Sequence, residues 1–98
     1  MENKLTIWIH RKYSTDFLTK LKNEISEQYL LSDRDFRFLD NTSGFKFTFD
    51  DETNGDISVF IEDHDETKTI TISGTFDWEV VAVYQTALGL LSKLIDSD

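Results

Sequence analysis

Three short runs between residues 45 and 73 decide the fold: Phe45-Lys46-Phe47-Thr48-Phe49, Ile57-Ser58-Val59-Phe60-Ile61 and Thr69-Ile70-Thr71-Ile72-Ser73. In each run apolar residues recur at every second position, and Phe36-Arg37-Phe38 is a shorter run of the same kind. Successive side chains of a β-strand point to opposite faces, so this alternation predicts four strands, each with one apolar face. The sheet is therefore expected to be covered on one side only.

The connections between these runs predict how the strands pair. We expect loops at residues 41–44, 53–55 and 64–67, with Gly55 in the left-handed position of the second loop. These loops pair Phe38 with Phe47, Phe36 with Phe49, Phe49 with Val59, Phe47 with Ile61, Asp63 with Lys68, Ile61 with Ile70, and Val59 with Ile72. All three loops agree on one buried face, which comprises Phe36, Phe38, Phe47, Phe49, Val59, Ile61, Ile70 and Ile72.

The flanking segments add one strand and two helices. Leu5, Ile7 and Ile9 alternate with Thr6, Trp8 and His10, as in a strand. Residues 17–31 and 77–95 carry apolar stripes at helical spacing. The order β-α-β-β-β-β-α predicts an α+β two-layer sandwich with a mainly antiparallel sheet and both helices on one face. The first strand is expected beside the last strand, antiparallel; a parallel place beside the second strand is the alternative.

Length and composition narrow the class of protein. The 98 residues suit one domain spanning residues 1–98, and 39% apolar residues suffice for a small core. The absence of cysteine excludes disulfide scaffolds, cysteine-based zinc sites and thiol catalysis. No apolar run is long enough to span a membrane, and the first residues lack the apolar stretch of a signal peptide. A cytoplasmic protein without membrane contact is expected.

Charge is concentrated in one segment. The net charge is −9, and the segment from Asp50 to Glu66 contains no basic residue. Its acidic residues are Asp50, Asp51, Glu52, Asp56, Glu62, Asp63, Asp65 and Glu66. Direct nucleic-acid binding usually needs a basic surface, so it is not expected. A protein partner with a basic surface is the prediction.

No motif in the chain predicts catalysis or a cofactor. The spacing Asp50-x-Glu52-x-Asn54-Gly55-Asp56 resembles the first half of an EF-hand loop, but Ile61 stands where the bidentate Glu is required. A turn with solvated acids is therefore expected, and a cation- or small-ligand-binding domain is the alternative. Nucleophile and phosphate-binding motifs are missing. We predict no enzyme, no cofactor and no metal site.

Two surfaces could contact a partner. The polar sheet face is predicted to expose Trp8, Phe60 and Leu39, with Leu39 in one cross-strand row with Lys46 and Glu62, and Phe60 in the next row with Arg37. Aromatic anchors within a polar rim are typical of interfaces. One side of the last helix is nearly uncharged and includes Trp78, Ala82, Thr86 and Gly89. We interpret this side as packing on the first helix or as a homodimer contact.

These observations predict a small acidic, non-catalytic protein-binding module. Its acidic segment would steer it toward a basic surface, and the aromatic face would supply the contact. The profile is typical of bacterial immunity proteins and phage-encoded inhibitors, so the expected role is inhibition of a basic partner. A nucleic-acid-processing protein is one such partner. A homodimeric structural subunit is the remaining alternative.

Overall fold

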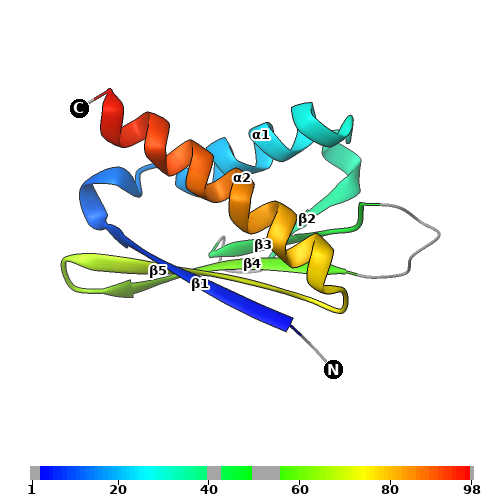
Figure 1. Ribbon diagram of the computed structural model, residues 1–98, viewed down its shortest axis with the longest axis horizontal. Coiled ribbons are helices and arrows are strands. Elements are labelled where there is room, and N and C mark those ends of the chain that lie inside the picture. The colour runs from blue at the N-terminus through cyan, green and yellow to red at the C-terminus, as the bar shows by residue number, and fades with distance from the viewer. Residues whose placement is uncertain (1–2, 40–42, 50–55, 98) are drawn as a thin grey trace.

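The described residues form five strands and two α-helices, joined partly by 3₁₀ turns. The computed structural model describes residues 3–39, 43–49 and 56–97 (Figure 1). The elements are β1 (Asn3–His10), η1 (Arg11–Tyr13), α1 (Phe17–Tyr29), η2 (Asp33–Asp35), β2 (Phe36–Phe38), β3 (Gly44–Phe47), β4 (Ile57–His64), β5 (Thr67–Gly74) and α2 (Asp77–Asp96). The predicted α+β class is confirmed.

The strands form one antiparallel sheet in the order β1-β5-β4-β3-β2. The N-terminal strand β1 pairs along its whole length with β5, as the sequence favoured. Figure 1 shows both helices above the same side of the sheet. The side chains between the two layers form the core, and no described helix covers the opposite side of the sheet.

The core is made by the apolar stripes of both layers. The α1 stripe recurs every four residues, at Phe17, Leu21 and Ile25, and all three side chains are fully buried. The sheet and α2 contribute Ile7, Ile9, Phe36, Phe45, Phe47, Ile57, Val59, Ile70, Ile72, Val80, Val83, Ala87 and Leu90. Helix α1 ends where Leu30 adopts a left-handed conformation (φ 57°) and its N–H donates to the Ser26 carbonyl. The burial of these stripes provides most of the stability expected for so small a domain.

The register of β4 with β5 is as predicted, but the registers of β2 and β3 are not. Ile61 pairs with Ile70 and Asp63 pairs with Lys68, as expected. In contrast, Phe36 lies opposite Phe47 rather than Phe49, and Phe38 lies opposite Phe45 rather than Phe47. Likewise Phe45 lies opposite Val59, and Phe47 lies opposite Ile57, whereas Phe49 and Ile61 were the expected partners. The predicted turn at Thr53-Asn54-Gly55 lies outside the described residues.

Gly44 gives the physical reason for the β3–β4 register. It lies opposite Phe60, and a Cβ added to it would lie 2.4 Å from the Val59 carbonyl oxygen. Only glycine allows the two backbones to approach so closely. The observed pairings differ from the predicted ones by even numbers of residues, so every side chain keeps its predicted face.

The shifted registers change which aromatic rings are buried. Phe45 and Ile57 are fully buried, although neither was among the predicted pairs. Phe38 was expected in the core but is 52% exposed, because it ends the short edge strand β2. Phe49 and Ile61 are only half-buried and pack at the margin of the core. Among the helices described, none is both long and apolar enough to cross a membrane.

Candidate partner-binding surface

The side of the sheet that faces away from the helices, called here the open sheet face, carries the candidate site. Alternation along the strands directs every second side chain to this face. Cross-strand pairing then arranges these side chains in four rows, the last of which is His10, Thr67 and His64. The first row is Trp8, Thr69 and Glu62; the second is Thr6, Thr71, Phe60 and Gly44; the third is Lys4, Ser73, Ser58, Lys46 and Arg37.

The predicted neighbours within the rows are wrong, because the observed registers of β2 and β3 differ from the predicted registers. Leu39 was expected beside Lys46 and Glu62, but its N–H donates to the Gly44 carbonyl, which places it at the end of the Phe60 row. Lys46 instead lies between Arg37 and Ser58. The three predicted apolar side chains, Trp8, Phe60 and Leu39, do share the open sheet face.

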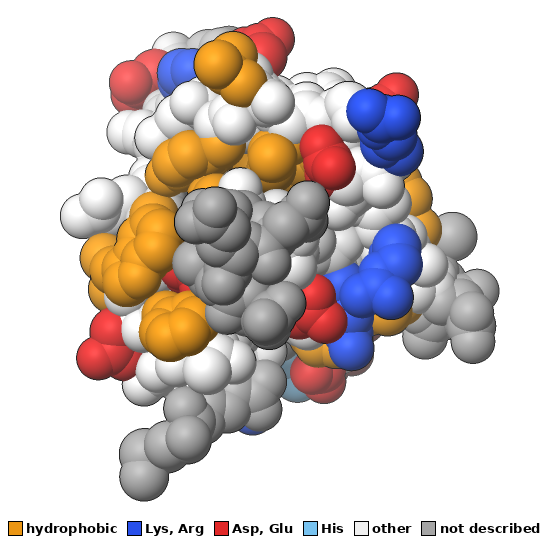
Figure 2. All heavy atoms as spheres, turned by 90° about the vertical axis from the view of Figure 1, so that its right-hand side faces the viewer, with side chains coloured by type: hydrophobic (Ala, Val, Ile, Leu, Met, Phe, Trp, Pro, Cys, Tyr) orange, Lys and Arg blue, Asp and Glu red, His pale blue; other side chains and the backbone are white. Residues whose placement is uncertain are grey.

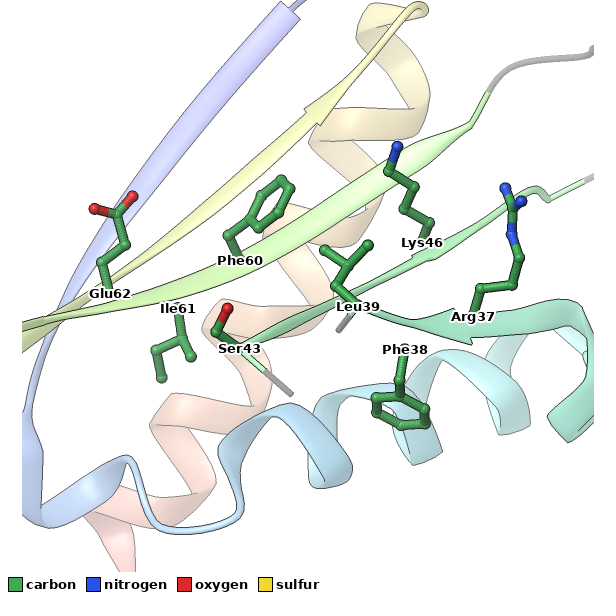
Figure 3. Close-up of a pocket in the computed structure, with 8 residues that line it drawn as sticks. All are labelled: Arg37, Phe38, Leu39, Ser43, Lys46, Phe60, Ile61 and Glu62. Atoms are coloured by element: carbon green, nitrogen blue, oxygen red, sulfur yellow. The ribbon is translucent and has the colours of Figure 1, made fainter. Parts of the chain in front are cut away.

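Phe60 and Leu39 form the apolar centre of this face. Each has a carbon that would lie 3.1 Å from a Cβ on Gly44, so the two side chains meet over the glycine. They line a shallow groove of about 710 Å³ together with Arg37, Lys46 and Glu62. Figure 3 shows Leu39, Lys46 and Phe60 on the open side, whereas Phe38 and Ile61 point toward the helices. The groove therefore has an apolar floor between charged walls.

Trp8 lies toward the other end of the face and is held by its neighbours. Its side chain is 63% exposed, and its ring centroid lies 5.3 Å from that of His64. The His64 Nε2 atom is in turn 3.1 Å from the Thr69 hydroxyl, and Thr69 is buried beneath them. A large exposed ring in a fixed position is a side chain that a partner can bury at low entropic cost.

The acidic residues gather mainly around the β4–β5 hairpin. Glu62, Asp63, Asp65 and Glu66 are all exposed. Asp63 pairs with Lys68 at 3.3 Å, and Asp65 adopts the left-handed conformation (φ 59°) that closes the hairpin. Glu62 lies in the Trp8 row, and the other three acids follow it along the chain. The exposed indole and the carboxylates therefore lie at the same end of the molecule.

The remaining predicted acids lie toward the opposite end of β4 or outside the described residues. Asp56 precedes β4 and accepts a bond from the Arg37 guanidinium at 3.5 Å. Five strand residues separate Asp56 from Glu62, the nearest of the hairpin acids, a distance of about 20 Å. Nothing is described for Asp50, Asp51 and Glu52. The described acids therefore form two separate groups rather than one continuous surface.

The sequence reasoning missed the basic row Lys4, Lys46 and Arg37. All three lie in one row because Lys46 pairs with Arg37 on one side and with Ser58 on the other, and Ser58 pairs with Ser73, which pairs with Lys4. A second groove of about 380 Å³ is lined by Lys4, Lys46, Ser58 and Ser73, among others. The net charge of −9 gives no indication of this basic row. Gly44 was the available signal, because it directly precedes the run from Phe45 to Phe49, and a glycine in a strand indicates close approach of two backbones.

The predicted patch on α2 is divided between two environments, because Gly89 lines the same interhelical groove as Ala82 and Thr86. Thr86 donates to Gln28 on α1 at 3.0 Å, and Ala82 faces the same interhelical groove. Trp78 is 60% exposed and stacks on Phe49 with ring centroids 5.9 Å apart. Figure 2 shows hydrophobic side chains at the surface of the end where α2 begins. A Cβ added to Gly89 would contact nothing within 4 Å, so no close intramolecular contact requires this glycine.

Glu79 is a buried acid that the sequence reasoning did not single out. It lies in the first turn of α2 and is fully buried. The positive end of the helix dipole favours a carboxylate at this position. Its place beside Val80, in the apolar stripe of the helix, was the signal in the sequence.

In the described part of the chain, no group of three or more His, Asp or Glu side chains is arranged so that it could hold a metal ion. His10 accepts a bond from the Lys12 N–H, and His64 contacts Trp8. A scan against models of known protein families finds no match, and a search of curated proteins finds no relative.

Proposed function

We propose that this chain is a non-catalytic protein-binding module that inhibits a partner with a basic surface, in the manner of an immunity protein or a phage-encoded inhibitor. The observation that carries the proposal is an exposed Trp8 fixed by His64, at the same end of the molecule as four exposed carboxylates. Tryptophan is one of the side chains that are enriched at interface hot spots. Its ring also attracts arginine and lysine side chains through cation–π contacts.

The charges around Trp8 suit a basic partner. Asp63 pairs with Lys68 within the hairpin, and the carboxylates of Glu62, Asp65 and Glu66 are exposed to solvent beside this pair. Exposed carboxylates at the rim of a contact attract a cationic surface over several ångströms and raise the association rate. Phe60 and Leu39 extend the contact across the sheet.

The proposal includes a cytoplasmic location and assigns no reaction to the open sheet face. The carboxylates project from an exposed hairpin, whereas catalytic acid–base pairs are usually held in a cleft that pushes their pKa values apart. Direct contact with nucleic acid or a membrane is not part of the proposal. The partner itself could act on nucleic acid, since such proteins expose basic grooves.

Affinity capture from a lysate of the organism that encodes this chain tests the proposal, because it selects a partner by binding alone. Wild-type protein, Trp8→Ala and Trp78→Ala serve as baits. Trp78 is a matched control, since it is as exposed as Trp8 but does not lie on the open sheet face. We expect a basic protein that wild type and Trp78→Ala retain and Trp8→Ala loses. Equal capture by all three baits would refute the role of Trp8.

The binding kinetics of the captured protein then separate the two contributions. Trp8→Ala should speed dissociation, with a loss of about 2 kcal/mol or roughly 30-fold in affinity. Reversing Glu62, Asp65 and Glu66 to Lys should slow association and weaken its dependence on salt, with less effect on dissociation. Unchanged association at low salt would show that these acids do not steer the partner.

A further inference from the structure

The free edge of β1 is a second surface that the proposed function does not use. Strand β1 forms one border of the sheet, and all eight of its residues pair with β5. No other strand in the described part of the chain pairs with its outer side. The opposite border, β2, is only three residues long. A long unpaired edge offers a row of backbone donors and acceptors to an added strand.

The hydrogen-bond pattern shows which backbone groups face outward. The Arg11 N–H donates to the Glu66 carbonyl at 2.9 Å, which extends the β1–β5 register by one residue. Bonded and non-bonded pairs alternate in antiparallel strands, so Leu5, Ile7 and Ile9 also bond to β5. The N–H and C=O groups at the free edge therefore belong to Lys4, Thr6, Trp8 and His10.

Helix α2 has an apolar flank on the side that faces away from α1. Thr86 bonds to Gln28, and Lys93 pairs with Glu24 at 3.2 Å, so one side of α2 faces α1. The other side carries Val81, Leu88 and Ile95, which are 43%, 40% and 48% exposed and recur every seven residues. We call these three residues the outer flank of α2.

The position of α2 brings the outer flank and the β1 edge together. Helix α2 packs over β5 and β1, and both α2 and β1 lie nearest the viewer in Figure 1. No charged residue occurs between residues 80 and 92 of this helix. An added strand would therefore place alternate side chains beneath an uncharged, apolar overhang.

Charge complementarity indicates the chemistry of the occupant. Residues 3–15 contain Lys4, Arg11 and Lys12 and no acidic residue, although the whole chain has a net charge of −9. All three basic side chains are exposed. A second copy of the chain would bring the same cations against each other along antiparallel β1 strands, which disfavours self-pairing. An acidic segment would instead meet three cations.

We propose that β1 accepts an extended, acidic segment of a partner protein by strand addition. Backbone groups of Lys4, Thr6, Trp8 and His10 would bond to the segment. Its apolar side chains would alternate toward the outer flank of α2, and its acidic side chains would lie toward Lys4 and η1. This inference goes beyond the proposed function, and either can fail alone, because one uses the β1 backbone and the other uses side chains of the open sheet face.

A synthetic peptide of nine residues, in which Glu and Val alternate, tests the inference directly. Amide hydrogen exchange of the free protein should be fast at Thr6 and Trp8 and slow at Ile7 and Ile9. The peptide should slow exchange at Thr6 and Trp8, whereas a peptide of alternating Lys and Val should bind at least about tenfold more weakly. No protection by the Glu/Val peptide at millimolar concentration would overturn the proposal. Protection in the free protein together with a dimeric mass would overturn it too, and would assign the edge to a second copy.

Two variants separate strand addition from nonspecific charge attraction. Thr6→Pro removes an outward N–H, and proline is tolerated at sheet edges where the N–H faces solvent. Its circular dichroism should stay native, while affinity for the Glu/Val peptide should fall by about tenfold. Lys4→Glu reverses an exposed charge, so it should weaken binding of the Glu/Val peptide and strengthen binding of the Lys/Val peptide. Unchanged affinity in both variants would overturn the proposal.

Discussion

At the scale of single residues, two glycines with opposite surroundings make a matched pair. A Cβ on Gly44 would lie 2.4 Å from the Val59 carbonyl oxygen, whereas a Cβ on Gly89 would contact nothing within 4 Å. We expect Gly44→Ala to destabilise the protein by about 1–3 kcal/mol, because β3 must move away from β4. Gly89→Ala should stabilise it by about 1 kcal/mol, because alanine favours the helix. Urea unfolding measures both changes in the free energy of unfolding. An unchanged free energy of unfolding in Gly44→Ala would contradict the close approach of β3 and β4.

The ion pair between Lys22 and Asp33 links α1 to η2 and should be visible in a titration. The Lys22 Nζ donates to the Asp33 carboxylate at 2.7 Å, and this hydrogen bond and positive charge lower the Asp33 pKa below its ordinary value of 3.8. A lowered folded-state pKa stabilises the fold above that ordinary value, and the contribution is lost as pH falls through the folded pKa. Lys22→Met should return the Asp33 pKa to its ordinary value, as measured by carboxyl NMR. An unchanged pKa would mean that the pair does not persist in solution.

At the scale of elements, the sequence predicted which side of the sheet each side chain faces better than it predicted the registers of the strand pairs. Alternation assigns Val59, Ile70 and Ile72 to the core correctly, because a side chain's face depends only on whether its position is odd or even. Loop length fixes the register only when the loop is short and well formed. The β4–β5 hairpin meets this condition, but the nine residues between Phe47 and Ile57 do not. The contact that selects the register is the backbone approach at Gly44, which is a tertiary feature.

The register makes a prediction about the phenylalanines of β3 and the segment after it. Phe45 is fully buried and contacts Phe36 and Phe47, so Phe45→Ala should cost about 3–5 kcal/mol. Phe49 is half-buried and stacks on the exposed Trp78, so Phe49→Ala should cost clearly less. Chemical denaturation of the two variants gives the comparison. The reverse order would favour the register in which Phe49 lies opposite Val59.

At the scale of the whole molecule, the sequence predicted which apolar residues share the site but not which residues are neighbours across the sheet. Trp8, Phe60 and Leu39 share one face because alternation alone places them there. The basic row of Lys4, Lys46 and Arg37 depends on successive strand pairings across the sheet, and two of these were predicted with shifted registers. Patterns within one run report on one strand, whereas a row across the sheet requires every register to be correct.

The net charge of −9 should make stability depend on ionic strength. Repulsion among like charges destabilises the compact state, and salt screens it, so the melting temperature should rise between about 10 and 200 mM sodium chloride. Calcium chloride at equal ionic strength should give a similar rise, since Ile61 occupies the position of the bidentate EF-hand ligand. Calorimetric scans provide the measurement. A calcium-specific stabilisation at micromolar concentration would support the alternative of a cation-binding turn.

The pairing of β1 with β5 has a consequence for the order in which the native structure can form during synthesis. Strand β1 is translated first, but its partner, residues 67–74, follows roughly 60 residues later. At about 5–20 residues per second, the ribosome needs on the order of 3–12 s to add them. Throughout that interval an alternating strand with Leu5, Ile7 and Ile9 has no native neighbour. Completion of β5 is therefore the event that ends the period of greatest aggregation risk, and a chain truncated before residue 67 would remain in it.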